Sequence, residues 1–166
     1  MKKRRRRDQQ AAAKLLSVPT EEDWGDYKGD IDREWTFKEY LGKSNADLRS
    51  SVIGYPLGAT EALRYMAPIP FRYYALGFNQ LLLENAFSGE YDSAGAASSF
   101  ITAARMKLEE EPHAILPILQ EIYPTLRQLC IRQEELGAPR KIYGDFNLRL
   151  IEIDKLIVAL GAPLPE

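Results

Sequence analysis

The sequence predicts an all-α protein: a single antiparallel bundle of five or six helices with an irregular acidic segment near the N-terminus. In several stretches between residues 71 and 160, apolar side chains recur at every third or fourth position, the period of a helix buried on one face. Proline and glycine stand at the starts and ends of these stretches, where they favour helix initiation and termination. The β-branched run 151–158 is the one candidate strand, and it has no second strand to pair with.

The composition fits one domain behind a charged arm. A chain of 166 residues with 45% hydrophobic and 10% aromatic residues can bury a core of its own. We expect residues 1–19 to form a basic N-terminal arm and residues 20–166 to form a single helical domain. The first eight residues hold six of the 22 basic and one of the 24 acidic residues, which leaves 16 basic and 23 acidic ones, a net charge of −7, in 9–166.

The arm has three interpretations. It is a flexible solubilising tail, a grip on a polyanion such as RNA, DNA or acidic lipid, or a localisation signal or contact with the chain's own acidic body. A polyanion grip would make binding steeply salt-dependent, because each neutralised phosphate releases counterions. The candidate polyanion-binding residues are Lys2, Lys3, Arg4, Arg5, Arg6 and Arg7.

The next segment, 20–58, is acidic and aromatic. Short helices are expected at 32–41 and at 45–51, the second capped by Ser44, and a loop at 54–58. Carboxylates interleaved with aromatic rings suit a basic protein partner, because the charges steer association and the rings provide contact area. Alternatively, Trp24, Trp35 and Phe37 fold back onto the bundle while the acidic groups face water. The predicted partner-binding residues are Trp24, Asp26, Tyr27, Asp30, Asp32, Glu34 and Trp35.

The helical region begins with three elements. Thr60 is expected to cap a helix that ends near residue 66, and Pro70 to start the next one, which runs to about residue 88. Ser93 is expected to cap a third helix, which continues to about residue 108. The small residues 94–97 would let a neighbouring helix approach closely.

Two further helices complete the prediction. One starts at Pro112 and ends before Gly137, with a kink or break at Tyr123 because Pro124 removes a backbone donor. The last covers 145–160. It is apolar over much of its circumference, which predicts a central position in the bundle.

Three consecutive carboxylates, Glu109–Glu111, stand at the end of the third of these helices. They oppose the helix dipole, which favours cations at that end. Either the helix ends before them, or a basic group neutralises them. The basic arm is one candidate for that group.

Catalytic and metal motifs are weak. His113 and Cys130 are the only residues of their kinds, and seventeen residues along one helix would separate them by about 25 Å. The spacing of Asp26, Asp30 and Asp32 does not match a calcium loop, which needs oxygen ligands at alternate positions and a central glycine. We therefore predict no cofactor, no metal and no enzymatic activity.

The leading hypothesis is a small, non-catalytic, cytoplasmic protein that binds a basic protein partner, with neutralisation of a toxin as one concrete form. The alternative is a nucleic-acid-associated protein that uses residues 2–7, extended by Arg64 and Arg72 among neighbouring aromatic residues. The single cysteine favours a reducing compartment. Because the chain has no long apolar run, we expect neither a leader peptide nor a membrane span.

Overall fold

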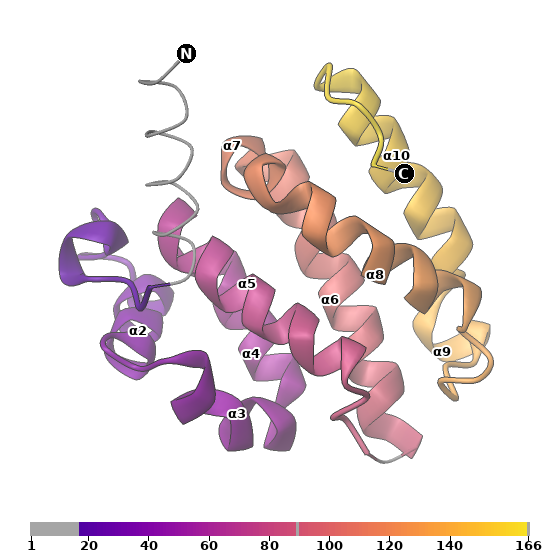
Figure 1. Cartoon of the computed structure of the whole chain (residues 1–166), viewed down its shortest axis with the longest axis horizontal. Coiled ribbons are helices and arrows are strands. Elements are labelled where there is room, and N and C mark those ends of the chain that lie inside the picture. Colours follow the sequence, from indigo (N-terminus) through magenta and orange to yellow (C-terminus); the bar gives the residue numbers. More distant parts are fainter. Residues whose placement is uncertain (1–16, 89, 166) are drawn as a thin grey trace.

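The computed structural model describes residues 17–88 and 90–165, without the side chains of Glu90 and Tyr91. Every regular element in these ranges is a helix, which confirms the all-α class. The longer helices pack on one another around a shared hydrophobic core (Figure 1). The basic run Lys2–Arg7 and the rest of the predicted arm up to residue 16 lie outside the described residues.

The acidic segment forms a 3-10 turn and two helices. The turn is Glu21–Trp24, and the helices are α2 (Ile31–Tyr40) and α3 (Asn45–Gly54). The helices predicted at 32–41 and 45–51 are therefore confirmed.

Side-chain caps explain where α2 and α3 begin. The carboxylate of Asp30 accepts hydrogen bonds from the backbone N–H groups of Asp32 and Arg33, both at 3.0 Å. Ser44 and Asp47 form a reciprocal capping box at the start of α3. These bonds satisfy backbone donors that have no partner within the helix.

The predicted loop at 54–58 is wrong, because α4 (Pro56–Tyr65) begins inside it. Pro56 stands at the first position of the helix, where its missing N–H costs nothing, and Tyr55 alone separates α3 from α4. The predicted cap at Thr60 is also wrong. Thr60 is buried within α4, and its hydroxyl donates to the backbone carbonyl of Pro56 at 3.1 Å.

The aromatic side chains of α5 (Pro68–Leu83) lie in the core. The helix begins two residues before the expected Pro70, again with proline in its first turn. It ends before Asn85, whose φ of 50° is incompatible with a continuing right-handed helix. Phe78 stacks on Phe100 with ring centroids 5.2 Å apart.

The longest helix, α6 (Glu90–Glu110), runs through the middle of the molecule (Figure 1). It begins before the predicted cap, Ser93, whose hydroxyl instead donates to the carbonyl of Phe87 at 2.6 Å. The helix packs most extensively on α4 and α10. The small residues on its buried side, Ala94, Ala96 and Ala97, allow this close approach.

The helix break predicted at Tyr123 occurs earlier. The chain forms α7 (Pro112–Ile115), a 3-10 turn at Leu116–Ile118 that contains Pro117, and then α8 (Leu119–Ile131). Pro124 lies within α8. The carbonyl of Gln120, which has no N–H to accept from at Pro124, belongs to an exposed residue and can bond to water.

The last two helices, α9 (Arg140–Tyr143) and α10 (Phe146–Ala159), are positioned by a buried glutamine. The amide nitrogen of Gln133 donates to the carbonyl of Gly144 at 2.6 Å, and its oxygen accepts from the backbone N–H of Phe146 at 2.9 Å. Both ends of this side chain therefore fix the start of α10 against the end of α8.

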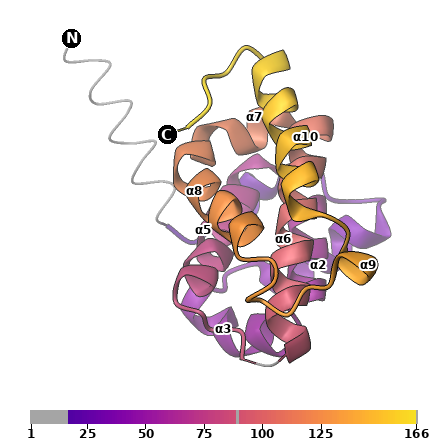
Figure 2. The ribbon, with the colours of Figure 1, turned by 90° about the vertical axis from the view of Figure 1, so that its right-hand side faces the viewer.

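The predicted central position of α10 is wrong. One side of the helix packs on α6 and α8, whereas the other side lies at the edge of the molecule (Figures 1 and 2). Several large apolar residues on that outer side are exposed.

Candidate partner-binding surface

Trp24 belongs to the core and not to the exposed surface. Its side chain is only 3% exposed, and its ring meets Phe37 edge-on at 5.7 Å and Tyr74 at 6.3 Å. Tyr27 also stacks on Phe37, with ring centroids 3.7 Å apart, and its hydroxyl donates to Glu21 at 3.2 Å. These two predicted partner residues therefore anchor the N-terminal segment on the helices beneath it.

Two of the predicted carboxylates hold the backbone. Asp30 caps α2, and Glu34 accepts a hydrogen bond from the N–H of Gly29 at 2.8 Å. Glu34 also lies 3.9 Å from the ammonium group of Lys38. Both carboxylates thus shape the loop before α2, and neither is an unpaired charge.

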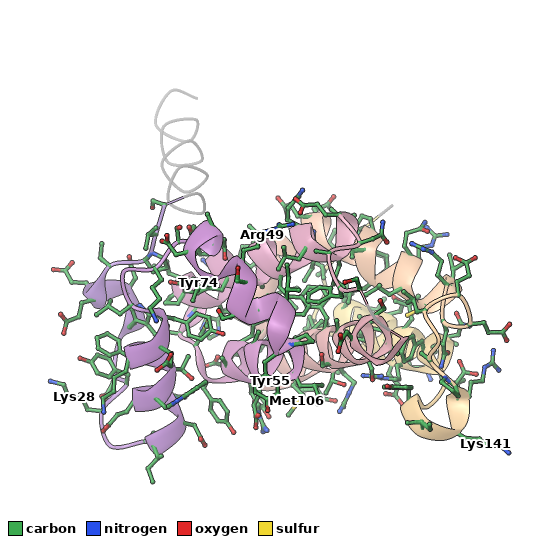
Figure 3. The ribbon with its side chains drawn as sticks, turned by 90° about the horizontal axis from the view of Figure 1, so that it is seen from below. Lys28, Arg49, Tyr55, Tyr74, Met106 and Lys141 are labelled. Atoms are coloured by element: carbon green, nitrogen blue, oxygen red, sulfur yellow. The ribbon has the colours of Figure 1, made fainter. Side chains whose placement is uncertain are left out.

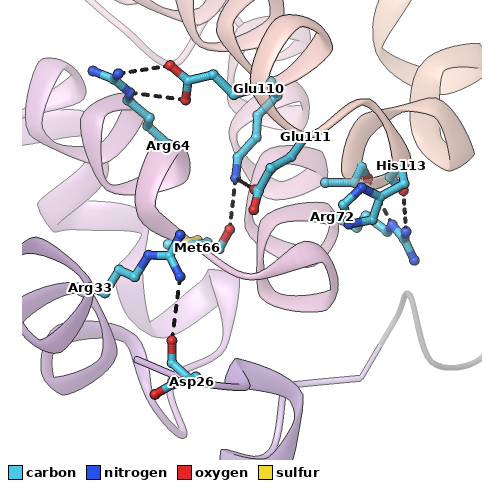
Figure 4. Close-up of polar contacts among 10 residues, drawn as sticks. Asp26, Arg33, Arg64, Met66, Arg72, Glu110, Glu111 and His113 are labelled. Carbon is cyan, nitrogen blue, oxygen red and sulfur yellow. Dashed lines mark hydrogen bonds and ion pairs between the residues drawn. The ribbon is translucent and has the colours of Figure 1, made fainter. Parts of the chain in front are cut away.

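Asp26 and Asp32 are exposed, and the carboxylate of neither forms an ion pair with another described residue. The backbone carbonyl of Asp26 accepts a hydrogen bond from Arg33 at 3.5 Å (Figure 4). Asp32 lies near Tyr65. Desolvation and then the charge of Asp32 raise the pKa of the Tyr65 hydroxyl.

Trp35 lies on the outward side of α2 and is 51% exposed. Together with Glu39 and Tyr55, it lines a shallow hollow of about 180 Å³ between α2, α3 and α4. Ile31, one turn before Trp35, is also exposed. An aromatic ring with apolar neighbours at the surface is typical of a protein contact site.

A larger groove of about 640 Å³ lies on the other side of Tyr55, between α4, α6 and α9. Tyr55 is 64% exposed and stands between the two depressions. Figure 3 shows Tyr55 and Met106 close together on this side of the molecule. Other residues that line the groove are Leu57, Glu61, Asp92, Ser99 and Tyr143.

The groove carries uncompensated negative charge. Within the described residues, neither Glu61 nor Asp92 forms an ion pair, while Arg64, the basic residue of the lining, is bound to Glu110 at 2.9 Å. We use the term acidic-aromatic face for Asp32, Trp35, Tyr55, Glu61 and Asp92.

The sequence points to only part of this face. The glycine and proline residues around Tyr55 and Leu57 predict a loop there, and Glu61 lies in a helix that has no charge pattern of its own. The available signal is the pair of large apolar side chains flanking Pro56, which a surface loop would not need.

A third depression, of about 430 Å³, lies beneath α3. Its walls are mainly buried aliphatic and aromatic side chains. Its polar side chains have partners within the protein: Asn45 donates to the carbonyl of Tyr73 at 3.0 Å, and Arg49 lies 2.7 Å from Glu84. The acidic-aromatic face is therefore the stronger candidate for a charged partner.

The carboxylates at the end of α6 are each neutralised by a cation of the helical domain. Arg105 lies 2.7 Å from Glu109, and Arg64 lies 2.9 Å from Glu110. The third pair is Lys107 with Glu111. Figure 4 shows Glu111 beside the pair of Arg64 and Glu110. The helix therefore extends through Glu110, and basic side chains of the described residues are enough to neutralise the three carboxylates.

The residues considered for catalysis or nucleic-acid binding have structural contacts instead. The guanidinium of Arg72 donates to the carbonyl of His113 at 2.7 Å and to that of Ala114 at 2.9 Å. His113 is exposed, whereas Cys130 is buried, and desolvation raises the pKa of the Cys130 thiol to about 12. Such a thiol remains protonated and is a poor nucleophile.

Within the described ranges, no three His, Cys, Asp or Glu side chains lie close enough together to hold a metal ion. In the same part of the chain, no helix has the length and apolar character needed to cross a membrane.

Comparison with known proteins identifies no relative, so the acidic-aromatic face is the basis for a functional proposal. No protein-family model matches the chain. No curated protein and no solved structure is significantly similar to it.

Proposed function

We propose that this chain is a small, non-catalytic interaction module, built as an antiparallel helical bundle, that binds a basic protein partner. Neutralisation of a basic toxin is one concrete form of this function. The observation that carries the proposal is the pair of exposed rings, Trp35 and Tyr55, with Tyr55 lining a groove whose carboxylates Glu61 and Asp92 form no ion pair with another described residue. The lone, buried Cys130 suits a reducing compartment such as the cytoplasm.

The physical basis is a division of roles between rings and charges. Large aromatic side chains at the centre of an interface supply much of its binding energy. Carboxylates around them accelerate association with a basic surface and disfavour acidic competitors. Asp32 lies in α2, one turn before Trp35, and Glu61 lies in α4, in the groove that Tyr55 also lines. Asp26 is a further exposed carboxylate in the same N-terminal segment.

A pull-down with matched variants tests this proposal. The double change Asp32→Lys and Glu61→Lys, and separately Trp35→Ala, should each reduce capture of the partner that the unmodified chain retains. The control is Glu121→Lys with Glu134→Lys, which makes the same charge change at two exposed sites away from the face. Equal capture by the test and control variants would remove the proposal. Asp30 is left unchanged because it caps α2.

The alternative function, nucleic-acid association through Lys2–Arg7, is favoured by the six consecutive basic residues. Deleting residues 2–7 should then lower affinity for RNA or DNA and reduce the salt slope, by about 0.9 for each B-DNA phosphate that the arm no longer neutralises. The proposed extension through Arg64 and Arg72 has less support, because both guanidinium groups bind within the protein. An unchanged salt slope would rule out the arm as the binding element.

A further inference from the structure

The outer side of α10 carries an apolar row that faces no other part of the described chain. Leu148 is 61% exposed, Ile151 48% and Val158 60%. The opposite side of the same helix is fully buried, through Phe146, Ile153 and Ile157. The helix is therefore apolar on both sides, although the described protein covers only one of them.

The row has the shape of a helix-packing surface. Leu148, Ile151, Lys155 and Val158 are separated by three, four and three residues, so they form one stripe along the helix. A hollow of about 370 Å³ lies on it, lined by Ile151, Lys155 and Val158 with their neighbours Asp154 and Ala159. A helix side chain of another molecule fits a depression of this kind.

The charges on α10 separate into inward and outward ones. Arg149 donates to the backbone carbonyl of Ser98 at 2.8 Å, and Asp154 accepts from the hydroxyl of Tyr123 at 2.8 Å. The outward charges are Glu152 and Lys155, and neither forms an ion pair with a described residue. The two outward charges are thus of opposite sign, and Asp154, at the edge of the hollow, is bound to Tyr123, so the outer side favours neither a strongly basic nor a strongly acidic partner.

We propose that a second copy of this chain docks on this face, with the two α10 helices antiparallel about a two-fold axis. In the register that places Ile151 of one copy opposite Lys155 of the other, Leu148 faces Val158. Lys155 of each copy is then one residue from Glu152 of the other, so two equivalent ion pairs form. An isologous contact of this type is the commonest in homodimers, and the central lysine defines the register.

The position of α10 keeps this contact separate from the proposed partner site. In Figure 1, α10 lies at one end of the molecule and α2 at the other. Arg149, on the side of α10 away from the row, contacts Ser98 and Thr102 in the wall of the groove, so the groove and the proposed contact lie on different sides of α10. Pairing through α10 leaves both copies of the acidic-aromatic face open. The dimer would bind two partners, or two sites on one partner with raised effective concentration.

Light scattering on a sizing column and sedimentation velocity test the contact, with the full chain over a range of concentrations. The unmodified chain should have the mass of a dimer, and Ile151→Glu should have the mass of a monomer with an unchanged far-ultraviolet circular dichroism spectrum. The control Ile142→Glu changes a residue in α9 that is 72% exposed, and this variant should remain dimeric. A monomer throughout the series for the unmodified chain would overturn the proposal, as would dimer formation by Ile151→Glu.

Charge exchange tests the register. Glu152→Lys places lysine opposite lysine in a homodimer, and Lys155→Glu places glutamate opposite glutamate, so each variant alone should dimerise more weakly. Mixing the two variants restores both opposite-charge pairs, and native mass spectrometry should then show mainly the mixed dimer. A statistical mixture of the three dimers would overturn this antiparallel register, because it would show that residues 152 and 155 do not meet across the contact.

Discussion

At the scale of single residues, Lys107 has the most unusual environment. Its side chain is buried, donates to the carbonyl of Met66 at 2.9 Å, pairs with Glu111 and lies 5.1 Å from the centre of the Phe71 ring. Burial lowers the pKa of Lys107, and the hydrogen bond to Glu111 opposes that change. This ammonium group joins the end of α4 to the end of α6.

Replacing Glu111 by glutamine should therefore lower the free energy of unfolding by about 1–3 kcal/mol, because the buried ammonium group loses its counter-charge. Glu109→Gln is the matched control. It breaks the pair with Arg105 at the surface, where an ion pair contributes about 0–1 kcal/mol. Urea denaturation of both variants checks the difference, and equal losses would contradict a special role for Lys107.

Cys130 gives the stability a defined pH dependence. Desolvation raises the pKa of its thiol to about 12, from an ordinary value of 9.0. Above pH 9 the unfolded chain loses this proton while the folded chain keeps it. The folded state then binds more protons, so the free energy of unfolding falls as the pH rises from 9 towards 12.

The contribution of this one group has a slope of at most about 1.4 kcal/mol per pH unit. In Cys130→Ala the decline above pH 9 should be shallower, although the cavity lowers stability at every pH. Thermal unfolding of both proteins at a series of alkaline pH values measures the two slopes. Parallel curves would show that the thiol does not titrate differently in the folded state.

At the scale of elements, the apolar period located α5, α6, α8 and α10, because each buries one regular stripe. The predictions that rested on glycine and proline instead were wrong at two places. Pro56 starts a helix instead of marking a loop, since the first helical position needs no N–H. Pro124 is accommodated in α8 because its side of the helix is exposed. The apolar residues around α10 indicated that both of its sides are buried, but the sequence could not show whether this chain or another molecule covers the outer side.

Gly58 in α4 supports the acidic-aromatic face by its lack of a side chain. The ring of Tyr55 lies over it, and a Cβ atom at this position would be 2.3 Å from the ring atom Cε1. Gly58→Ala should displace the exposed ring and reduce partner capture. Stability should change by no more than about 1 kcal/mol, because alanine favours the helix and the ring can move into solvent.

Tyr55→Ala provides the control for this change. Once the ring is absent, adding Gly58→Ala should cause no further loss of capture in the same pull-down, because the two changes act through one group. An additional loss of capture in the double variant would mean that the alanine at residue 58 alters the helix α4 and does not act only by displacing the Tyr55 ring. Circular dichroism would then show whether the helix had changed.

At the scale of the whole molecule, the sequence predicts the distribution of charge better than it predicts which aromatic rings are exposed. The acidic character of 21–39 follows from the sequence, whereas the sequence left open whether Trp35 is exposed or packs on the bundle. The contribution of Tyr55, Glu61 and Asp92 could not be predicted. Tyr55 and Glu61 belong to the start and body of α4 and Asp92 belongs to α6, and the packing of α4 on both α2 and α6 brings them together.

The basic arm should oppose the function proposed for the acidic body. Removing Lys2–Arg7 changes the net charge of the chain from −2 to −8, which strengthens its long-range attraction for a basic protein. With the partner captured by the acidic-aromatic face, this deletion should raise the association rate at low salt and leave the dissociation rate nearly unchanged. Stopped-flow mixing at two salt concentrations measures both, and the increase should shrink at the higher one, since screening weakens steering. A slower association after the deletion would show that the arm itself contacts the partner, and the basic run would then belong to the binding site.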